Sequence, residues 1–283
     1  MSAKINDVTD TALWVAVYRA RETERSQPLF RDPLARKLAG ERGPSIEKAM
    51  HDSNYVEWSV VMRTCIIDEY IMTLVGEGLD CVVNLGAGLD TRPYRMELPK
   101  TLRWIEVDFP NIINLKNERL ASEVPRCRLE RIALDLAKES ERSTLFAKIN
   151  AESKNVLVLT EGVTPYLSNA DVASLAKGLR EQSHFKHFIA DYNSRELIKR
   201  VRHRRRKQMR NAPFLFDPPD WTNFYADLGW KVRAMKYLGE EASRLGRPAP
   251  HPWSMRALLS IMSAKKKEKL LRMNGYALLE PIS

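Results

Sequence analysis

The sequence predicts an α/β fold in which a mostly parallel sheet carries helices on both faces. Short β-rich runs alternate with helical spans from residue 80 onward, which is the pattern of successive βαβ units. A glycine turn follows the first of these runs, and an acidic residue follows each of the next three. The first 75 residues instead have the pattern of helices separated by turns. One domain with a helical amino-terminal cap is therefore the simplest organisation.

The composition is that of a folded globular protein. Of the 283 residues, 44% are hydrophobic and 29% are charged, which excludes a disordered chain. No run approaches the roughly 18 consecutive apolar residues of a membrane helix, and the first ten residues lack the apolar core of a signal peptide. Cys65, Cys81 and Cys127 form no CxxC pair, so we expect neither a disulfide framework nor a zinc site. A reducing cytoplasmic location is the natural interpretation.

The amino-terminal helices are expected at three places. Thr9 or Asp10 can cap a first helix, and the aspartate and proline of Asp32-Pro33 suit the start of a second. Gly43-Pro44 is expected to break the chain again. Residues 55–75 are apolar nearly all round, which is typical of a buried helix.

Strands and helices are expected to alternate in the chain after residue 80. Strands are expected at residues 81–85, 103–107, 127–134, 155–159, 185–191, 230–237 and 276–279. Helices are expected between or after them at residues 112–123, 171–182 and 253–262.

The first ligand-binding signal lies in residues 81–96, CVVNLGAGLDTRPYRM, where an apolar strand leads into Gly86 and Gly88. Glycine leaves backbone N–H groups open to a ligand because no side chain shields them. The third glycine of the dinucleotide fingerprint is absent, since residue 91 is threonine. The turn alone therefore leaves a ligand site and a tight strand-to-helix turn equally open.

Acidic residues follow the next three strands. Asp108 comes 22 residues after Gly86, where a carboxylate can bind ribose hydroxyls or cap a helix. Asp135 can accept a bond from an exocyclic amine, with Leu136 against an adenine ring, or can also cap a helix. Glu161 follows the fourth strand. Because parallel strands end at one edge of a sheet, we expect these residues to gather there.

Arg63 lies in the apolar helix and has no acid at its helical neighbour positions. A largely buried guanidinium needs an anionic partner from elsewhere. That partner is either a carboxylate of the protein core or the carboxylate of an amino-acid ligand, which arginine binds in a bidentate fork.

These motifs together resemble the leucine carboxyl methyltransferase family, which includes bacterial polyketide O-methyltransferase-like members. The resemblance covers roughly the first 190 residues and is carried by RTCIIDEYI (63–71), NLGAGLDTRPYR (84–95), EVDFP (106–110), LDL (134–136) and LTEGVTPYL (159–167). It implies a class I methyltransferase fold with a doubly wound, Rossmann-like sheet of seven strands and S-adenosyl-L-methionine as the methyl donor. It implies no metal.

The resemblance also assigns residues to the donor. Arg63 would hold the methionine carboxylate, Gly86 and Gly88 the methionyl portion, and Glu161 the amino end. Asp108 would bind the ribose, and Asp135 with Leu136 the adenine. By the same resemblance, Arg19 is a second candidate for the carboxylate.

The resemblance divides the single methyltransferase domain into four parts. Residues 1–78 form the helical cap, 79–192 the donor-binding core, 193–228 a basic helical insert or lid after the fifth strand, and 229–283 the C-terminal end of the sheet. The net charge of +10 is concentrated in residues 195–210, where nine Lys/Arg residues accompany one Glu. A surface for nucleic acid or another anionic partner is possible there, although a solvated helix face is preferred.

The expected activity is S-adenosylmethionine-dependent O-methylation of a carboxylate or hydroxyl of a small molecule, and less favourably of a peptide C-terminal carboxylate. An ionised carboxylate needs no general base, whereas a hydroxyl does. Tyr166 is the catalytic candidate, and His184, His187 and Asp191 are further candidates by position only.

Two alternatives remain open from the residues. An NAD(P)-dependent oxidoreductase would share the glycine turn and Asp108, but gives no role to Arg63 or to the Thr160-Glu161-Gly162 turn. A non-catalytic RNA- or anion-binding protein on the same fold would use the basic insert.

Overall fold

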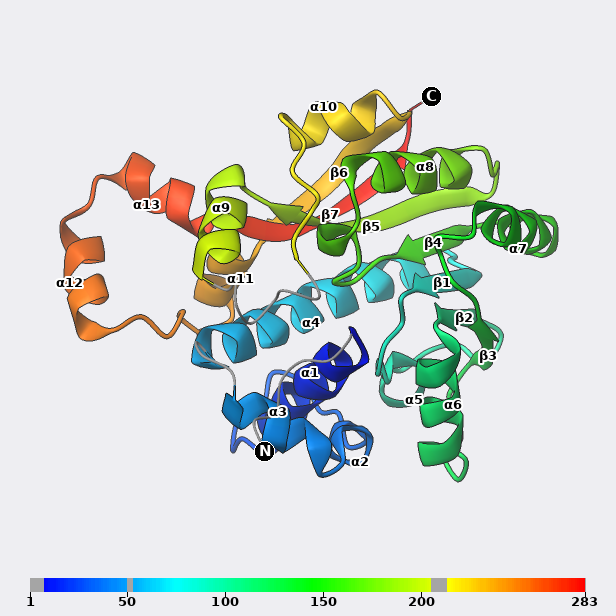
Figure 1. Cartoon of the computed structure of the whole chain (residues 1–283), viewed down its shortest axis with the longest axis horizontal. Coiled ribbons are helices and arrows are strands. Elements are labelled where there is room, and N and C mark those ends of the chain that lie inside the picture. Colours follow the sequence, from blue (N-terminus) through cyan, green and yellow to red (C-terminus); the bar gives the residue numbers. More distant parts are fainter. Residues whose placement is uncertain (1–7, 50–52, 205–212, 283) are drawn as a thin grey trace.

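The computed structural model describes residues 8–49, 53–204 and 213–282 (Figure 1). Seven strands form one sheet in the order β3-β2-β1-β4-β5-β7-β6. Strands β1 to β5 are parallel, whereas β7 pairs antiparallel with both β5 and β6. The prediction of a doubly wound, mostly parallel, seven-stranded sheet is confirmed.

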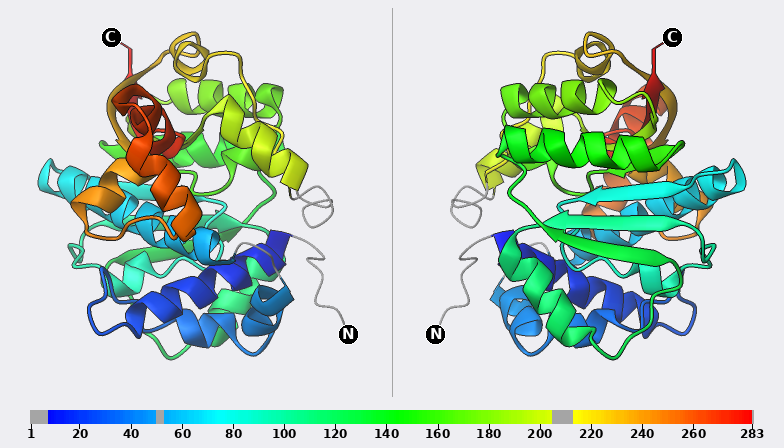
Figure 2. Two further views of the ribbon diagram at one scale, coloured as in Figure 1. Left: turned by 90° about the vertical axis from the view of Figure 1, so that its left-hand side faces the viewer. Right: turned by 90° about the vertical axis from the view of Figure 1, so that its right-hand side faces the viewer.

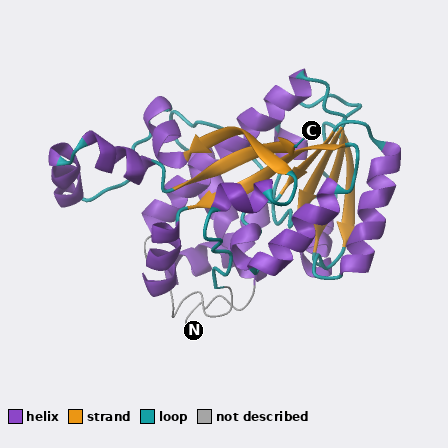
Figure 3. Cartoon of the chain, turned by 90° about the horizontal axis from the view of Figure 1, so that it is seen from above, coloured by secondary structure: helices purple, strands orange, loops and turns teal. Residues whose placement is uncertain are grey.

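The strands lie within a few residues of their expected bounds. They are β1 Cys81–Leu85, β2 Arg103–Asp108, β3 Arg128–Ala133, β4 Val156–Leu159, β5 Phe185–Asn193, β6 Trp230–Tyr237 and β7 Asn274–Pro281. Every residue of β1 and β4 is buried because these strands lie inside the sheet and under helices on both faces. Seen from above, the strands fan out with the sheet's twist (Figure 3).

One face of the sheet is covered by α7 (Glu139–Glu152), α8 (Asn169–Arg180) and α10 (Trp221–Ala226). Helix α8 begins at a capping box, in which Ser168 and Asp171 satisfy each other's backbone amides. Its buried residues lie at helical spacing and pack on the sheet. Figure 1 shows α8 and α10 on one side of the strands and α4 on the other.

The opposite face carries α4 (Ser53–Gly76), α5 (Arg92–Arg95), α6 (Pro110–Arg119) and α11 (Leu238–Arg244). The predicted apolar helix is α4, and its buried side chains pack with Leu157, Leu159 and Ile189 of the sheet. The right-hand view of Figure 2 shows the strands between these two helical layers.

The amino-terminal cap consists of α1 (Val8–Thr23), α2 (Ala35–Ala39) and α3 (Arg42–Ala49). Their apolar side chains form a separate core, which Leu89 and Leu120 join from the region of the sheet. The cap therefore packs beside the turn that follows β1.

The expected helix starts in the cap are wrong. Asp10 lies in the first turn of α1 and not at the cap position before it, and its carboxylate pairs with Arg42 at 2.7 Å. The side chain of Thr9 lies outside the described part. Asp32 is likewise no cap, because α2 begins at Ala35 and the Asp32 carboxylate binds Arg19.

The predicted break at Gly43-Pro44 is also wrong, because both residues lie in the first turn of α3. Proline is tolerated in the first turn, where its missing N–H would have no partner within the helix. Gly43 packs so closely on α1 that a Cβ would lie 2.9 Å from Val17 Cγ2.

The segment after β5 begins with α9 (Arg195–Arg204), and α12 (Trp253–Ile261) and α13 (Ala264–Leu271) precede β7. Residues 205–212, which hold much of the basic run, lie outside the described residues. Within the described part, Arg195 and Arg202 both pair with Asp217, at 3.2 and 3.0 Å.

Within the described ranges no helix has the length and apolar character to cross a bilayer. Likewise, no group of three or more His, Cys, Asp or Glu residues there is placed to hold a metal ion.

Candidate functional site

The predicted site residues lie in sequence along one edge of the sheet. The parallel strands β3, β2, β1, β4 and β5 are neighbours in that order, so their carboxyl ends form a continuous rim. From one end of the rim to the other, the residues at these strand ends are Asp135, Asp108, Gly86, Glu161 and Asp191.

Asp108 joins the end of β2 to the glycine turn. Its Oδ2 accepts a hydrogen bond from the Gly88 amide at 2.6 Å, and its Oδ1 accepts one from the Phe109 amide at 2.7 Å. Burial raises the pKa of this carboxyl group, and the two amides oppose the rise. Asp108 is not the N-cap of α6, because that position is Phe109.

The glycine turn has the conformation that glycine permits. Gly86 and Gly88 have φ angles of +67° and +49°, in the left-handed region that other residues avoid. A Cβ on Gly86 would lie 2.4 Å from Val163 Cγ2, so the Val163 side chain fills the space directly over this glycine. A ligand chain that crosses Gly86 therefore has to displace Val163.

Asp135 and Leu136 follow β3 at the far end of the rim. The Asp135 Oδ1 accepts a hydrogen bond from the Ala137 amide at 3.0 Å, and α7 begins only at Glu139. Asp135 therefore stabilises the turn without capping the helix. Leu136 is half-buried against the core under this face.

Arg63 finds its anionic partner within the protein. Its Nε lies 2.8 Å from Glu161 Oε1, an ion pair although not a hydrogen bond of good geometry. Arg92 Nη1 binds the other oxygen of Glu161 at 2.7 Å. Burial favours the neutral form of Glu161, but the charges of Arg92 and Arg63 outweigh it and hold the pKa of Glu161 below its usual range.

A buried charge network continues from Glu161 and was missed in the sequence. Arg92 also pairs with Asp68 at 2.6 Å and Asp90 at 3.0 Å, and Arg95 pairs with Asp68 at 2.7 Å. Asp68 is separated from Arg92 and Arg95 by 24 and 27 residues, so local spacing gives no sign of these pairs. The only sequence signal is that all three lie in the motifs that carry the family resemblance.

Arg19 links the amino-terminal cap to the rim. Its Nε lies 2.9 Å from Asp32 Oδ2, and its Nη2 donates to the Leu89 carbonyl just after the glycine turn. The structure thus gives Arg19 two protein partners, and its role toward the donor carboxylate stays a prediction.

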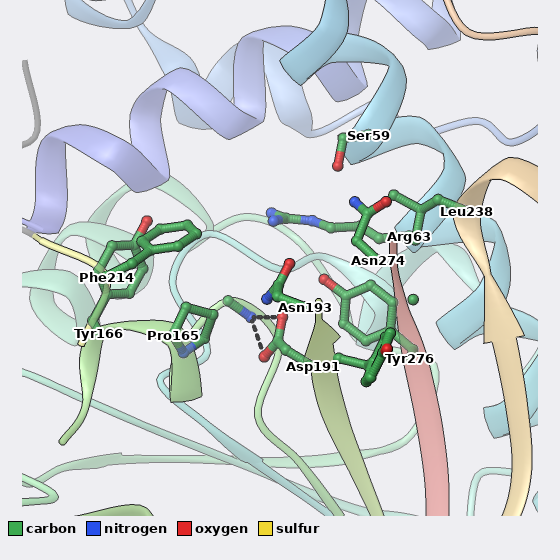
Figure 4. A pocket seen from close by; sticks show the side chains of 13 residues that line it. Ser59, Arg63, Pro165, Tyr166, Asp191, Asn193, Phe214, Leu238, Asn274 and Tyr276 are labelled. Carbon is green, nitrogen blue, oxygen red and sulfur yellow. Dashed lines mark hydrogen bonds between the residues drawn. The ribbon is translucent and has the colours of Figure 1, made fainter. Parts of the chain in front are cut away.

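Beside the rim, a cavity of about 110 Å³ opens between the ends of β4 and β5 and the start of β7 (Figure 4). Its lining comes from several elements and includes Arg63, Tyr166, Asp191, Phe214 and Tyr276. Tyr166 belongs to the short 3-10 turn η1 (Thr164–Tyr166), and its ring packs edge-on against Phe214 at 5.2 Å.

Of the four candidate bases, Tyr166 and Asp191 line this cavity. His184 does not, because it precedes β5 at the amino end of the strand, and its Nδ1 lies 2.8 Å from the Asn150 carbonyl. His187 lies in the first half of β5, and the charges that act on it include Arg233 and Glu77, which are not among the cavity-lining residues. The two histidines therefore lie apart from this cavity.

The residues of the rim fit the adenosyl part of S-adenosyl-L-methionine. Asp108 is held beside the glycine turn with a carboxylate that can accept from ribose hydroxyls. The neighbouring Phe109, which was not predicted as a site residue, is 45% exposed and offers an apolar face for an adenine ring. When bound, this donor supplies an electrophilic methyl group on a sulfonium.

Comparison with known proteins identifies the family. Residues 12–180 match the leucine carboxyl methyltransferase family. A Frankia alni protein named as a candidate S-adenosyl-L-methionine-dependent methyltransferase is 32% identical over 255 residues, which cover 86% of this chain and 88% of that protein. A Streptomyces coelicolor protein named in the same way is 36% identical over 183 residues, covering 61% and 64%.

Solved structures share the fold. A candidate methyltransferase from Thermobifida fusca superposes with a TM-score of 0.57 at 13% identity, covering 99% of this chain and 96% of that one. A DUF574-family protein from Streptomyces avermitilis gives a TM-score of 0.56, also at 13% identity, over 94% and 96%. The chain belongs to the leucine carboxyl methyltransferase family and is an S-adenosyl-L-methionine-dependent methyltransferase.

Proposed function

We propose that this enzyme transfers a methyl group to an oxygen of a small molecule, either a carboxylate or a hydroxyl. The observation that carries the proposal is the cavity beside the rim, with its polar lining of Arg63, Tyr166, Asp191 and Tyr276. A cavity of about 110 Å³ suits the reacting end of a small molecule better than a peptide chain. A peptide C-terminal carboxylate is accordingly the less favoured acceptor.

Two groups of residues are proposed to hold the donor. At the adenosyl end these are Asp108, Asp135 and Leu136, and at the methionyl end they are Gly86, Gly88, Arg63 and Glu161. Arg63 is already paired with Glu161, so we expect the donor carboxylate to share the guanidinium with Glu161. Orientation of the acceptor against the methyl group then supplies most of the rate.

The division into a cap (1–78), a donor-binding core (79–192), an insert (193–228) and the C-terminal end of the sheet (229–283) is part of the same proposal. Phe214 of the insert lines the cavity, which supports a lid role for this segment. Cys65, Cys81 and Cys127 are all unpaired, which suits the reducing cytoplasm that we propose as the location.

The decisive experiment is a methyl-transfer screen with purified protein and donor carrying a labelled methyl group. The acceptor library contains matched carboxylic acids and alcohols or phenols, and mass spectrometry identifies each product. We expect labelled methyl esters or ethers, which are lost in Asp108→Ala. The control variant is Glu181→Ala, an exposed residue just after α8, and it should retain activity. Label found only on nitrogen or carbon, or only on peptide termini, would contradict the proposal.

A further inference from the structure

Asp191 is a buried carboxylate in the cavity wall that has no ion-pair partner among the described residues. It is 5% exposed and lies in β5 beside Arg63 and Tyr276 (Figure 4). Across the described ranges, no Lys, Arg or His nitrogen pairs with it within 4.0 Å, because Arg63 pairs with Glu161 instead. A buried charge of this kind is unfavourable for folding and is therefore typical of a functional position.

Asp191 accepts hydrogen bonds from the Gly162 amide and from the hydroxyls of Thr164 and Tyr276. The Gly162 amide is shared between its two oxygens at 3.2 Å each, and the Thr164 hydroxyl lies 3.2 Å from Oδ2. Asp108, on the same rim, accepts two separate amide bonds at 2.6 and 2.7 Å. The bonds from Gly162 and Thr164 to Asp191 are therefore weaker than the amide bonds to Asp108. Because a carboxylate has about four acceptor positions, Asp191 can still accept from a group in the cavity.

Charged and titratable groups face Asp191 from each element packed around it. They are Arg63 of α4, Glu161 after β4, Tyr276 of β7 and Tyr225 of α10. Burial raises the pKa of Asp191 to about 6, although Arg63, Tyr276 and the Gly162 amide oppose the rise. Burial first, and then the charge of Asp191, raise the pKa values of Tyr276 and Tyr225, so both phenols stay protonated.

We propose that Asp191 is the general base of this enzyme and that the acceptor presents a neutral hydroxyl to the cavity. This proposal rests on the proposed O-methyl transfer. The acceptor oxygen bonds to the donor methyl carbon while its proton moves to an Asp191 carboxylate oxygen. The carbon–sulfur bond breaks, and its electron pair stays on sulfur, so the sulfonium becomes a thioether. Asp191 then releases the proton to water.

The cavity lining favours a hydroxyl over a carboxylate. A carboxylate acceptor would place a second anion beside Asp191 in a buried site, where like charges repel strongly. Arg63 offsets only part of this repulsion, since it also pairs with Glu161. The neutral side chains of Ser59, Asn193 and Asn274 add hydrogen-bonding groups that suit an alcohol or phenol.

The first test uses S-adenosylmethionine and S-adenosylhomocysteine, which differ by one methyl group and one positive charge. Their dissociation constants are measured by calorimetry between pH 5 and pH 8 for wild type, Asp191→Asn and the exposed control Asp227→Asn. If ionised Asp191 faces the reacting methyl group, the preference for the charged ligand increases about tenfold with pH in wild type and in Asp227→Asn. Asp191→Asn should lack this increase, since titration of the ligands themselves is common to all three proteins.

An identical pH profile in wild type and Asp191→Asn overturns the assignment of Asp191. Failure of both ligands to bind at any pH would instead contradict the proposed function.

The second test addresses the acceptor class. Para-fluorophenol and para-fluorobenzoate are titrated by fluorine NMR into the S-adenosylhomocysteine complex at pH 8. We expect the phenol to bind wild type more tightly than Asp191→Asn, and the benzoate to show the reverse order. Benzoate that binds wild type as tightly as it binds the variant would overturn the hydroxyl proposal.

Discussion

At the scale of single residues, two carboxylates on one edge of the sheet are held in opposite ways. Asp108 is fixed by two short amide bonds, and a ribose would meet a carboxylate whose position is already set. Asp191 shares the Gly162 amide between its two oxygens at 3.2 Å and has no ion pair among the described residues. The first arrangement suits binding, and the second suits proton exchange.

Asp108 gives the plainest binding prediction. Asp108→Ala removes the acceptor for two ribose hydroxyls and should weaken S-adenosylhomocysteine binding by about 2 kcal/mol, or roughly 30-fold. Calorimetry measures the change, and Glu181→Ala serves as the distant control. A folded Asp108→Ala protein with unaltered affinity would show that the ribose lies elsewhere.

Removing the charge of Asp191 should increase the free energy of unfolding. The pKa of Asp191 is raised in the folded protein from 3.8 to about 6, so the folded state binds more protons than the unfolded state between these values. Stability conferred by this group is therefore present at low pH and is lost as pH rises toward 6. At pH 8, Asp191→Asn should be more stable than wild type by up to about 3 kcal/mol.

Urea unfolding at several pH values measures this difference, which should shrink below pH 6 as wild type takes up the proton. A variant that is less stable at pH 8 would mean that the bonds to Gly162 and Thr164 matter more than the desolvated charge.

Removing the charge of Glu161 should instead lower the free energy of unfolding. Glu161→Gln leaves the buried guanidinium groups of Arg63 and Arg92 without the carboxylate between them. Breaking a buried pair from one side should destabilise the fold by about 3 to 5 kcal/mol. Chemical denaturation of Glu161→Gln checks the value, with Glu141→Gln in the exposed pair with Lys138 as a control that should show no change. Adding Arg63→Met to Glu161→Gln should recover part of the loss, and a purely additive result would refute the coupling.

At the scale of elements, the turn after β4 decides whether the donor can enter. Gly162 has a φ of +68°, and the next residue, Val163, lies over Gly86. The donor's methionyl portion is proposed to occupy that space, so the turn has to shift before binding is complete.

Val163→Ala removes the obstructing methyl groups and should speed S-adenosylhomocysteine association, because less displacement is then required. Stopped-flow fluorescence measures the rate. The matched control is Val172→Ala, a fully buried valine of α8, which should lower stability without changing association. Equal association rates for wild type and Val163→Ala would show that the turn does not limit entry.

The elements themselves could be predicted from sequence more completely than the site. The strands at residues 81–85 and 156–159 are buried runs rich in β-branched and aliphatic residues. Short runs of this kind between helical spans predict strands. The partner of Arg63 could not be chosen, because a core carboxylate and a ligand carboxylate satisfy a guanidinium equally well. The sequence does not show that Pro44 lies within a first helical turn, because this depends on where α3 begins.

At the scale of the whole molecule, hydrogen bonds join residues 1–78 to distant parts of the chain. Arg19 reaches the Leu89 carbonyl, Trp58 Nε1 donates to the Arg247 carbonyl at 2.8 Å, and the Tyr70 hydroxyl donates to the Tyr276 carbonyl at 3.1 Å. Apolar packing continues across the same boundary.

These links predict that the chain unfolds as one unit. Differential scanning calorimetry should show a single transition with equal calorimetric and van't Hoff enthalpies. S-adenosylhomocysteine at 100 times its dissociation constant should stabilise the whole transition by about 2.7 kcal/mol. Two transitions, of which only one responds to the ligand, would mean that the cap folds independently of the donor-binding core.

The position of β7 has a consequence for biosynthesis. This strand follows β6 in the chain but inserts between β5 and β6, and it brings Asn274, Gly275 and Tyr276 to the cavity. A nascent chain that has emerged only as far as β6 therefore lacks the strand that pairs with both β5 and β6. The edges of β5 and β6 are then unpaired, and the cavity lacks the residues that β7 supplies. Such edges invite pairing with other chains. Ribosome stalling or premature termination between β6 and β7 should therefore yield a product that aggregates, not a folded enzyme with reduced activity.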